Sequence, residues 1–122
     1  MQYMNFKKPY LFLRNLPQKL NNHYKKKSQF NLKVANKSKN KKDYDPVTNF
    51  DKALEKYIRS IIHKSFPHDS IVGEELKDKY SSNNYKWSID PIDGTRAFII
   101  GAPTWSNLIS LSYKEKSILG LA

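Results

Sequence analysis

Apolar side chains recur at helical spacing between residues 48 and 66. Thr48 precedes this stripe, and Asp51 follows three residues later, an arrangement that resembles a capping box with aspartate in place of glutamate. Pro67 cannot continue a helix. The pattern therefore predicts a helix over residues 48–66. Its apolar positions, which share one face at a period of 3.6 residues, are Phe50, Ala53, Leu54, Tyr57, Ile58, Ile61 and Ile62.

Shorter segments alternate between apolar and polar residues, which is typical of strands. One of them, at 85–90, is expected to end at Pro91, because proline has no N–H to donate to a sheet. A short helix at 95–100 is expected to end at Gly101. Helices and strands mixed in this order predict an α/β layered fold. The predicted strands cover residues 30–35, 71–72, 85–90, 105–113 and 118–122, and the last two form a hairpin around residues 114–116.

The positive charge is concentrated at the N-terminus. Residues 1–43 contain 12 of the 22 Lys and Arg residues and 1 of the 11 acidic residues, so the remaining chain is neutral overall. Pro17 can occupy the first turn of a helix over residues 16–27. A basic segment can bind nucleic acid or an anionic surface. Because few aromatic side chains accompany these lysines, we favour a solvated segment, and nucleic-acid binding remains the non-enzymatic alternative.

Composition limits the classes of protein that remain. A chain of 122 residues is at most one domain by length. The absence of cysteine excludes disulfides and thiolate chemistry, and it fits a cytoplasmic location. No apolar run approaches the roughly 18 residues that a membrane-spanning helix needs, so we expect no membrane association.

The segment from Asp90 to Thr95, Asp-Pro-Ile-Asp-Gly-Thr, carries the clearest candidate chemistry. Its two carboxylates flank a turn and can point at one site. Carboxylate oxygens suit Mg²⁺, which also takes substrate phosphate oxygens as ligands. A helix that begins after Gly94 offers N–H donors to a phosphate. Two aspartates at this spacing can also simply cap a helix, but Glu74 upstream favours a metal site for phosphoryl chemistry.

These residues resemble motifs of the inositol monophosphatase-like superfamily of Mg²⁺-dependent phosphatases. The hallmark spans residues 90–95, and two further motifs appear in the expected order before it: Val47-Thr48-Asn49-Phe50-Asp51 and Gly73-Glu74-Glu75. The segment 96–105 is most similar to the histidinol-phosphate phosphatase branch. Inositol-type members usually have Asn before Phe98, where this chain has Ala97.

The resemblance implies a role for each site residue. Asp90 would bridge two metals, the Ile92 carbonyl oxygen would bind one, and Asp93 would bind a second and face the substrate. The complete site would hold two or three Mg²⁺ ions. Glu74 would complete the first metal site and position the attacking water. We expect Glu75 to be a solvated neighbour.

The resemblance also assigns the phosphate contacts. The N–H groups of Gly94 and Thr95 would bind phosphate oxygens, and the Thr95 hydroxyl would orient the water. Asp51 has two equally supported roles: it caps the helix at 48–66, or it accepts a hydrogen bond from Thr95 or from the water.

The implied function is hydrolysis of a small-molecule phosphate monoester by metal-activated water. L-histidinol phosphate, a substrate of histidine biosynthesis, is the expected substrate, and inositol monophosphate or another sugar phosphate is the alternative. The complete enzyme could be a homodimer. The likeness covers residues 30–122, which we expect to form a truncated N-terminal half of the phosphatase domain, inactive alone, after a basic segment at 1–29 that retains part of a first helix.

Overall fold

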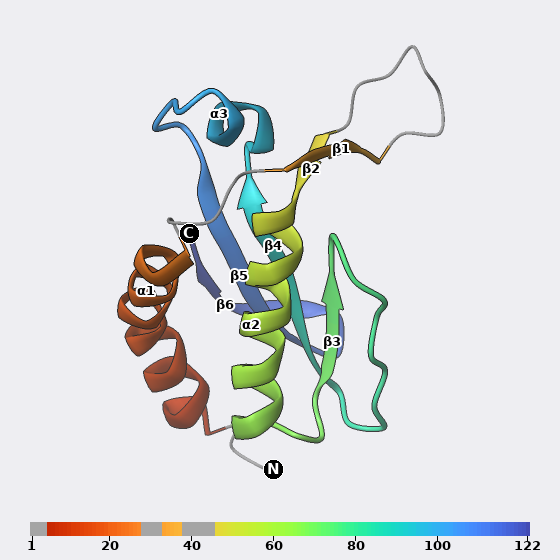
Figure 1. Cartoon of the computed structure of the whole chain (residues 1–122). Helices are drawn as coiled ribbons and strands as arrows, with labels where there is room; N and C mark the ends of the chain where they lie inside the picture. The colour runs from red at the N-terminus through yellow and green to blue at the C-terminus, as the bar shows by residue number, and fades with distance from the viewer. Residues whose placement is uncertain (1–4, 28–32, 38–45) are drawn as a thin grey trace. The chain divides into compact units, whose positions relative to one another are not determined.

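The computed structural model describes residues 5–27, 33–37 and 46–122 of the chain (Figure 1). The chain forms two compact units, residues 1–31 and 32–122. No helix in the described parts is long and apolar enough to cross a membrane. The elements are α1 (Lys7–Lys27), β1 (Val34–Asn36), β2 (Pro46–Thr48), α2 (Asn49–Ser65), β3 (Ser70–Gly73), β4 (Tyr85–Asp93), α3 (Thr95–Ile99), β5 (Ser106–Tyr113) and β6 (Lys116–Leu121).

Helix α1 is longer than the sequence predicted. The expectation that Pro17 opens a helix over 16–27 is wrong, because the helix begins at Lys7 and Pro17 lies inside it. The Asn5 side chain accepts the N–H of Lys7 at 3.0 Å, as a capping side chain does. The leucine pattern across 13–20 keeps helical spacing on both sides of the proline, which favours continuing the helix despite one missing backbone hydrogen bond.

Helix α2 confirms the prediction for residues 48–66. Thr48 is its N-cap, and the predicted capping box with Asp51 is present. The Thr48 N–H donates to Asp51 Oδ1 at 2.9 Å, and the Asp51 N–H donates to Thr48 Oγ1 at 3.2 Å. The helix ends at Ser65, and Phe66 is its C-cap, immediately before Pro67. Its beginning is therefore fixed partly by Asp51, which is also a predicted site residue.

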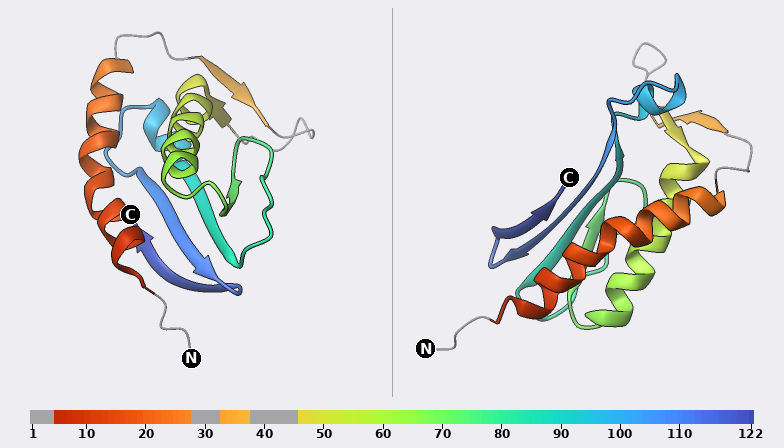
Figure 2. Two further views of the ribbon diagram at one scale, coloured as in Figure 1. Left: turned by 90° about the horizontal axis from the view of Figure 1, so that it is seen from below. Right: turned by 90° about the vertical axis from the view of Figure 1, so that its left-hand side faces the viewer.

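The sheet has the strand order β3-β4-β5-β6, with α2 against one of its faces (Figure 2). β3 pairs with β4 in parallel, and the other pairs are antiparallel. This arrangement confirms the predicted α/β class. Ring contacts reinforce the core, since the Phe66 and Trp87 centroids lie 5.1 Å apart. The buried apolar side chains of α2 and the sheet are Leu54, Ile58, Ile62, Ile71, Trp87, Ile89, Ile92, Ile109 and Leu111.

Strand β4 passes through Pro91, so the prediction that it ends there is wrong. The pairing with β5 is interrupted between Asp90 and Asp93, and Pro91 lies in that irregular stretch, where no ladder N–H is required. The Pro91 carbonyl instead accepts a 2.6 Å hydrogen bond from the Asn107 side chain of β5.

The other predicted elements are present with small changes at their ends. The hairpin of β5 and β6 turns through Lys114 and Glu115, whose φ angles are 47° and 65°. β6 therefore begins at Lys116, two residues before the predicted start. Of the strand predicted at 30–35, β1 covers only the end, and residues 30–32 lie outside the described residues.

Candidate active site

Four segments of the second unit meet at the end of β4. They are the loop after β3, the end of β4 with its irregular pairing, the start of α3, and Lys37 just after β1. The cavity between them has a volume of about 380 Å³. Its lining includes every residue that the sequence predicted for metal and phosphate binding, namely Glu74, Asp90, Ile92, Asp93, Gly94 and Thr95, and it also includes Lys37, Glu75 and Arg96. Asp51, the remaining predicted site residue, lies behind this lining.

Asp51 connects the beginning of α2 to the wall of the cavity. The Thr95 hydroxyl lies 3.0 Å from Asp51 Oδ2 and 3.1 Å from the Ile92 carbonyl oxygen. Asp51 is fully buried, and its Oδ1 also accepts hydrogen bonds from the N–H and the hydroxyl of Thr48. The two roles considered for Asp51 are therefore compatible, because one carboxylate oxygen belongs to the capping box and the other contacts Thr95.

The cavity is electrostatically acidic although the whole chain carries a charge of +11. Burial raises the pKa of Asp90 to about 6, and the neighbouring carboxylates of Glu74 and Asp93 add to the increase. Mutual repulsion among these acids favours binding of a cation. The Lys37 ammonium is one such charge, with its Nζ 3.4 Å from Glu74 Oε1 and 3.2 Å from Glu75 Oε1.

Glu75 is not the solvated neighbour that the sequence predicted. Its side chain is only 2% exposed, whereas that of Glu74 is 55% exposed. Burial raises the pKa of the Glu75 carboxyl, and Lys37 opposes this rise. The prediction failed because neighbouring residues of one loop can face opposite ways, and a common surface motif does not show which side is covered.

The donors around the cavity fit a hard divalent cation. Carboxylate and carbonyl oxygens are the ligands that Mg²⁺ prefers, and it needs only one or two protein carboxylates when phosphate and water complete its shell. Within the described residues, however, no three acidic or histidine side chains lie close enough together to form a ready-made metal cage. The oxygen donors of the cavity therefore fit a divalent cation such as Mg²⁺. The acidic side chains are distributed along the lining.

Helix α3 is held at the cavity by packing and by Gly94. The Phe98 ring contacts Phe50 of α2 at 5.8 Å and Trp105 at 5.0 Å between centroids. Gly94 has a φ of 86°, and a Cβ there would lie 2.9 Å from the Thr104 carbonyl oxygen. The fold thus requires glycine at this position independently of any phosphate.

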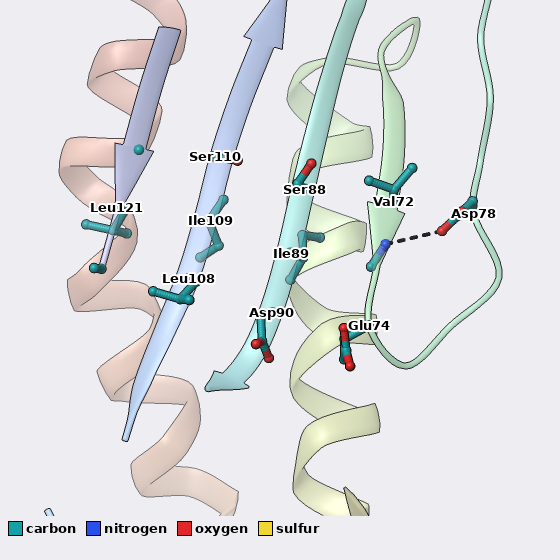
Figure 3. A pocket seen from close by; sticks show the side chains of 13 residues that line it. Val72, Glu74, Asp78, Ser88, Ile89, Asp90, Leu108, Ile109, Ser110 and Leu121 are labelled. Atoms are coloured by element: carbon teal, nitrogen blue, oxygen red, sulfur yellow. Dashed lines mark hydrogen bonds between the residues drawn. The ribbon is translucent and has the colours of Figure 1, made fainter. Parts of the chain in front are cut away.

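A larger hollow, of about 710 Å³, extends from Glu74 and Asp90 along the sheet face. Figure 3 shows these two carboxylates at one end of it. Four small or short residues form a row across the strands and leave this space open, since Val72 pairs with Ser88, Ser88 with Ser110, and Ser110 with Gly120. Glu74 and Asp90 therefore border both cavities.

Three residues of the site region were not singled out by the sequence analysis. Lys37 was part of a lysine-rich loop with no feature to single it out. Asn107 was read only as a strand residue. Glu55 could have been noticed, because it is a charged residue beside the apolar stripe of α2, four positions after Asp51, and it is fully buried.

Two curated relatives illustrate what the sequence is similar to. The chain is 47% identical over 83 residues to the bifunctional phosphatase IMPL2 of Arabidopsis thaliana, covering 66% of this chain and 24% of that protein. It is 43% identical over 81 residues to a histidinol-phosphatase of Chlorobaculum parvum, covering 66% and 31%. The chain therefore spans less than a third of the length of these relatives.

Solved structures match a larger share of the chain. The structure of an IMPase/NADP phosphatase complexed with NADP and Ca²⁺ matches 98% of this chain and 45% of that chain, with a TM-score of 0.81 and 20% identity, which shows the fold alone. The SuhB protein of Bartonella henselae matches 84% and 38%, with a TM-score of 0.70 and 27% identity. The model of the inositol monophosphatase family matches residues 11–122. The chain therefore belongs to the inositol monophosphatase family.

Proposed function

We propose that the cavity at the end of β4 is the metal-dependent site of a phosphomonoesterase. The observation that carries this proposal is the shared lining, in which the carboxylates of Glu74, Asp90 and Asp93 border the same space as the turn at Gly94 and Thr95. The acids can hold cations, and the turn can hold a phosphate. A site with only one of these features would support a weaker conclusion.

The first proposed role of the site residues is to bind the metal ions. Glu74, Asp90, Asp93 and the Ile92 carbonyl oxygen would hold two or three Mg²⁺ ions. That carbonyl oxygen lies 3.1 Å from Thr95 Oγ1, and its two lone pairs leave it able to ligate a cation. When bound, the ions neutralise the phosphate and lower the pKa of water.

Thr95 and Glu74 orient the attacking water. Because a hydroxyl has one proton, Thr95 can donate it to Asp51 at 3.0 Å and leave its oxygen lone pairs to accept from the water. Glu74, whose carboxylate is half exposed, can accept the water's other proton. The N–H groups of Gly94 and Thr95 bind phosphate oxygens, and Asp93 faces the substrate.

The proposed substrate is L-histidinol phosphate, which places the enzyme in histidine biosynthesis. The curated relatives named histidinol-phosphatase support this choice, and so does the segment Arg96-Ala97-Phe98. Inositol monophosphate or another sugar phosphate is the second candidate, supported by the Aquifex aeolicus relative named fructose-1,6-bisphosphatase/inositol-1-monophosphatase, which is 39% identical over 82 residues. A cytoplasmic location is part of the same proposal.

The proposed domain comprises residues 30–122, with the basic segment 1–29 before it. Because the chain spans less than a third of the length of the curated relatives described above, we propose that residues 1–122 alone have little or no phosphatase activity. The deciding assay is therefore phosphate release by the full gene product, from L-histidinol phosphate and from inositol 1-phosphate side by side.

The assay compares Mg²⁺ with excess chelator, and wild type with Asp93→Asn. We expect activity to require Mg²⁺ and to fall by at least about a hundredfold in the variant, because a charged ligand is lost. His68→Asn, at an exposed position outside the cavity, is the control and should leave the rate unchanged. Turnover that persists in chelator would refute the metal site, and a preference for inositol phosphate would refute the substrate.

A further inference from the structure

A buried carboxylate on α2 holds the loop that carries Glu74. Glu55 is fully buried, and its two oxygens accept the backbone N–H groups of Glu75 at 2.8 Å and Leu76 at 2.9 Å. The bonds join residues 20 and 21 positions apart in the sequence. A carboxylate that accepts two backbone N–H groups fixes the direction of the peptide planes that it contacts.

Arg59, one helical turn further along α2, completes the contact. Its Nε donates to Glu55 Oε2 at 2.9 Å. Its two terminal nitrogens donate to the carbonyl oxygens of Lys77, at 2.8 Å, and Leu76, at 3.1 Å. The planar guanidinium can reach the carboxylate and both carbonyl oxygens at once, which a lysine ammonium cannot do with the same geometry.

The contact between Glu55 and the loop leaves no space for a side chain at Gly73. A Cβ at Gly73 would lie 2.4 Å from Glu55 Oε1, so the carboxylate lies against the backbone at the residue before Glu74. Asp51 and Glu55 are four residues apart and therefore neighbours on the helix surface. One helical turn of α2 thus contacts Thr95 through Asp51 and the Glu74 loop through Glu55.

Stability alone is a poor explanation for this pair. Burying two charges removes their hydration, and the attraction between them does not always offset this cost. A protein in which apolar residues of similar size replace such a pair is often as stable as the original. The hydrogen bonds that Glu55 and Arg59 make to the loop go to backbone groups of residues 75–77, next to Glu74. Hydrogen bonds that fix the backbone direction of the loop can also fix the orientation of the adjacent side chain.

We propose that Glu55 and Arg59 are positioning residues that set the orientation of Glu74, and so the affinity of the site for its cation. This inference rests on the proposed function of the cavity. Neither residue borders the cavity itself, so both act through the loop.

The test uses Glu55→Gln in the full gene product, since glutamine has nearly the same shape but can accept through one oxygen only. We expect amide hydrogen exchange at Glu75 and Leu76 to become about tenfold faster, while exchange in β4 and β5 is unchanged. Mn²⁺ affinity, measured calorimetrically well below the unfolding temperature, should fall by about tenfold or more. Arg59→Lys should give a smaller loss of the same kind.

Ile62→Val is the matched control, because Ile62 is fully buried on the same helix and the substitution lowers stability without touching the loop's hydrogen bonds. An equal loss of Mn²⁺ affinity in this control would overturn the proposal, because the effect would then follow stability. Unchanged exchange or unchanged affinity in Glu55→Gln would also overturn it. Absence of Mn²⁺ binding by the wild-type chain would instead refute the metal site, and with it the purpose assigned to this pair.

Discussion

Alanine substitutions at Gly94 and Gly101 allow the cost of a steric clash at the site to be measured separately from the cost of backbone strain. Both glycines have a positive φ, of 86° and 75°. A Cβ at Gly94 would lie 2.9 Å from the Thr104 carbonyl oxygen, whereas a Cβ at Gly101 would meet nothing within 4 Å. Replacing each by alanine therefore introduces the same kind of strain, and only the first substitution adds a contact with backbone that must move.

The expected magnitudes follow from these two terms. Alanine at a positive φ costs on the order of 1 kcal/mol after allowance for the reduced entropy of the unfolded chain. Overpacking against a backbone atom adds about 1–3 kcal/mol. We therefore expect Gly101→Ala to lower the free energy of unfolding by about 1 kcal/mol and Gly94→Ala to lower it by about 2–4 kcal/mol.

Urea unfolding followed by far-ultraviolet circular dichroism measures both variants under the same conditions. With a slope of about 1–3 kcal/mol per molar urea, the predicted difference moves the midpoint by roughly 1 M. The slopes should agree between the variants, since both leave the buried surface of the native chain unchanged. Equal midpoints for Gly94→Ala and Gly101→Ala would refute the argument from the Thr104 contact.

The remaining predictions concern single side chains. Asp69→Ala should lower the free energy of unfolding by about 2–3 kcal/mol in urea, since Asp69 is 7% exposed and accepts the Trp87 indole N–H at 2.8 Å; a loss below about 0.5 kcal/mol would contradict this. Glu115→Gly should raise the free energy of unfolding by up to about 1 kcal/mol in the same assay by relieving a φ of 65°, and a decrease would count against it. Asp51→Asn should keep the fold but lower activity of the full gene product, because the Thr95 proton loses its carboxylate acceptor at 3.0 Å; full activity would contradict the proposed role.

The elements that the sequence determined are those fixed by local rules. The limits of α2 follow from a 3.6-residue stripe, a capping pair within one turn and a proline, all of them contacts between near neighbours. The hairpin of β5 and β6 follows in the same way from alternation and a short polar turn. The motif from Asp90 to Thr95 identified the candidate chemistry because its spacing is itself local.

The tertiary structure decided what distant residues do to one another. The bond between Thr95 and Asp51 spans 44 residues, and nothing in either local pattern specifies it. The passage of β4 through Pro91 depended on the pairing with β5, and the burial of Glu55 and Glu75 depended on which side of a loop faces α2. Periodicity specifies the face that an element buries, but the partner across that face is set by how elements far apart in the chain pack together, and this packing determines the site.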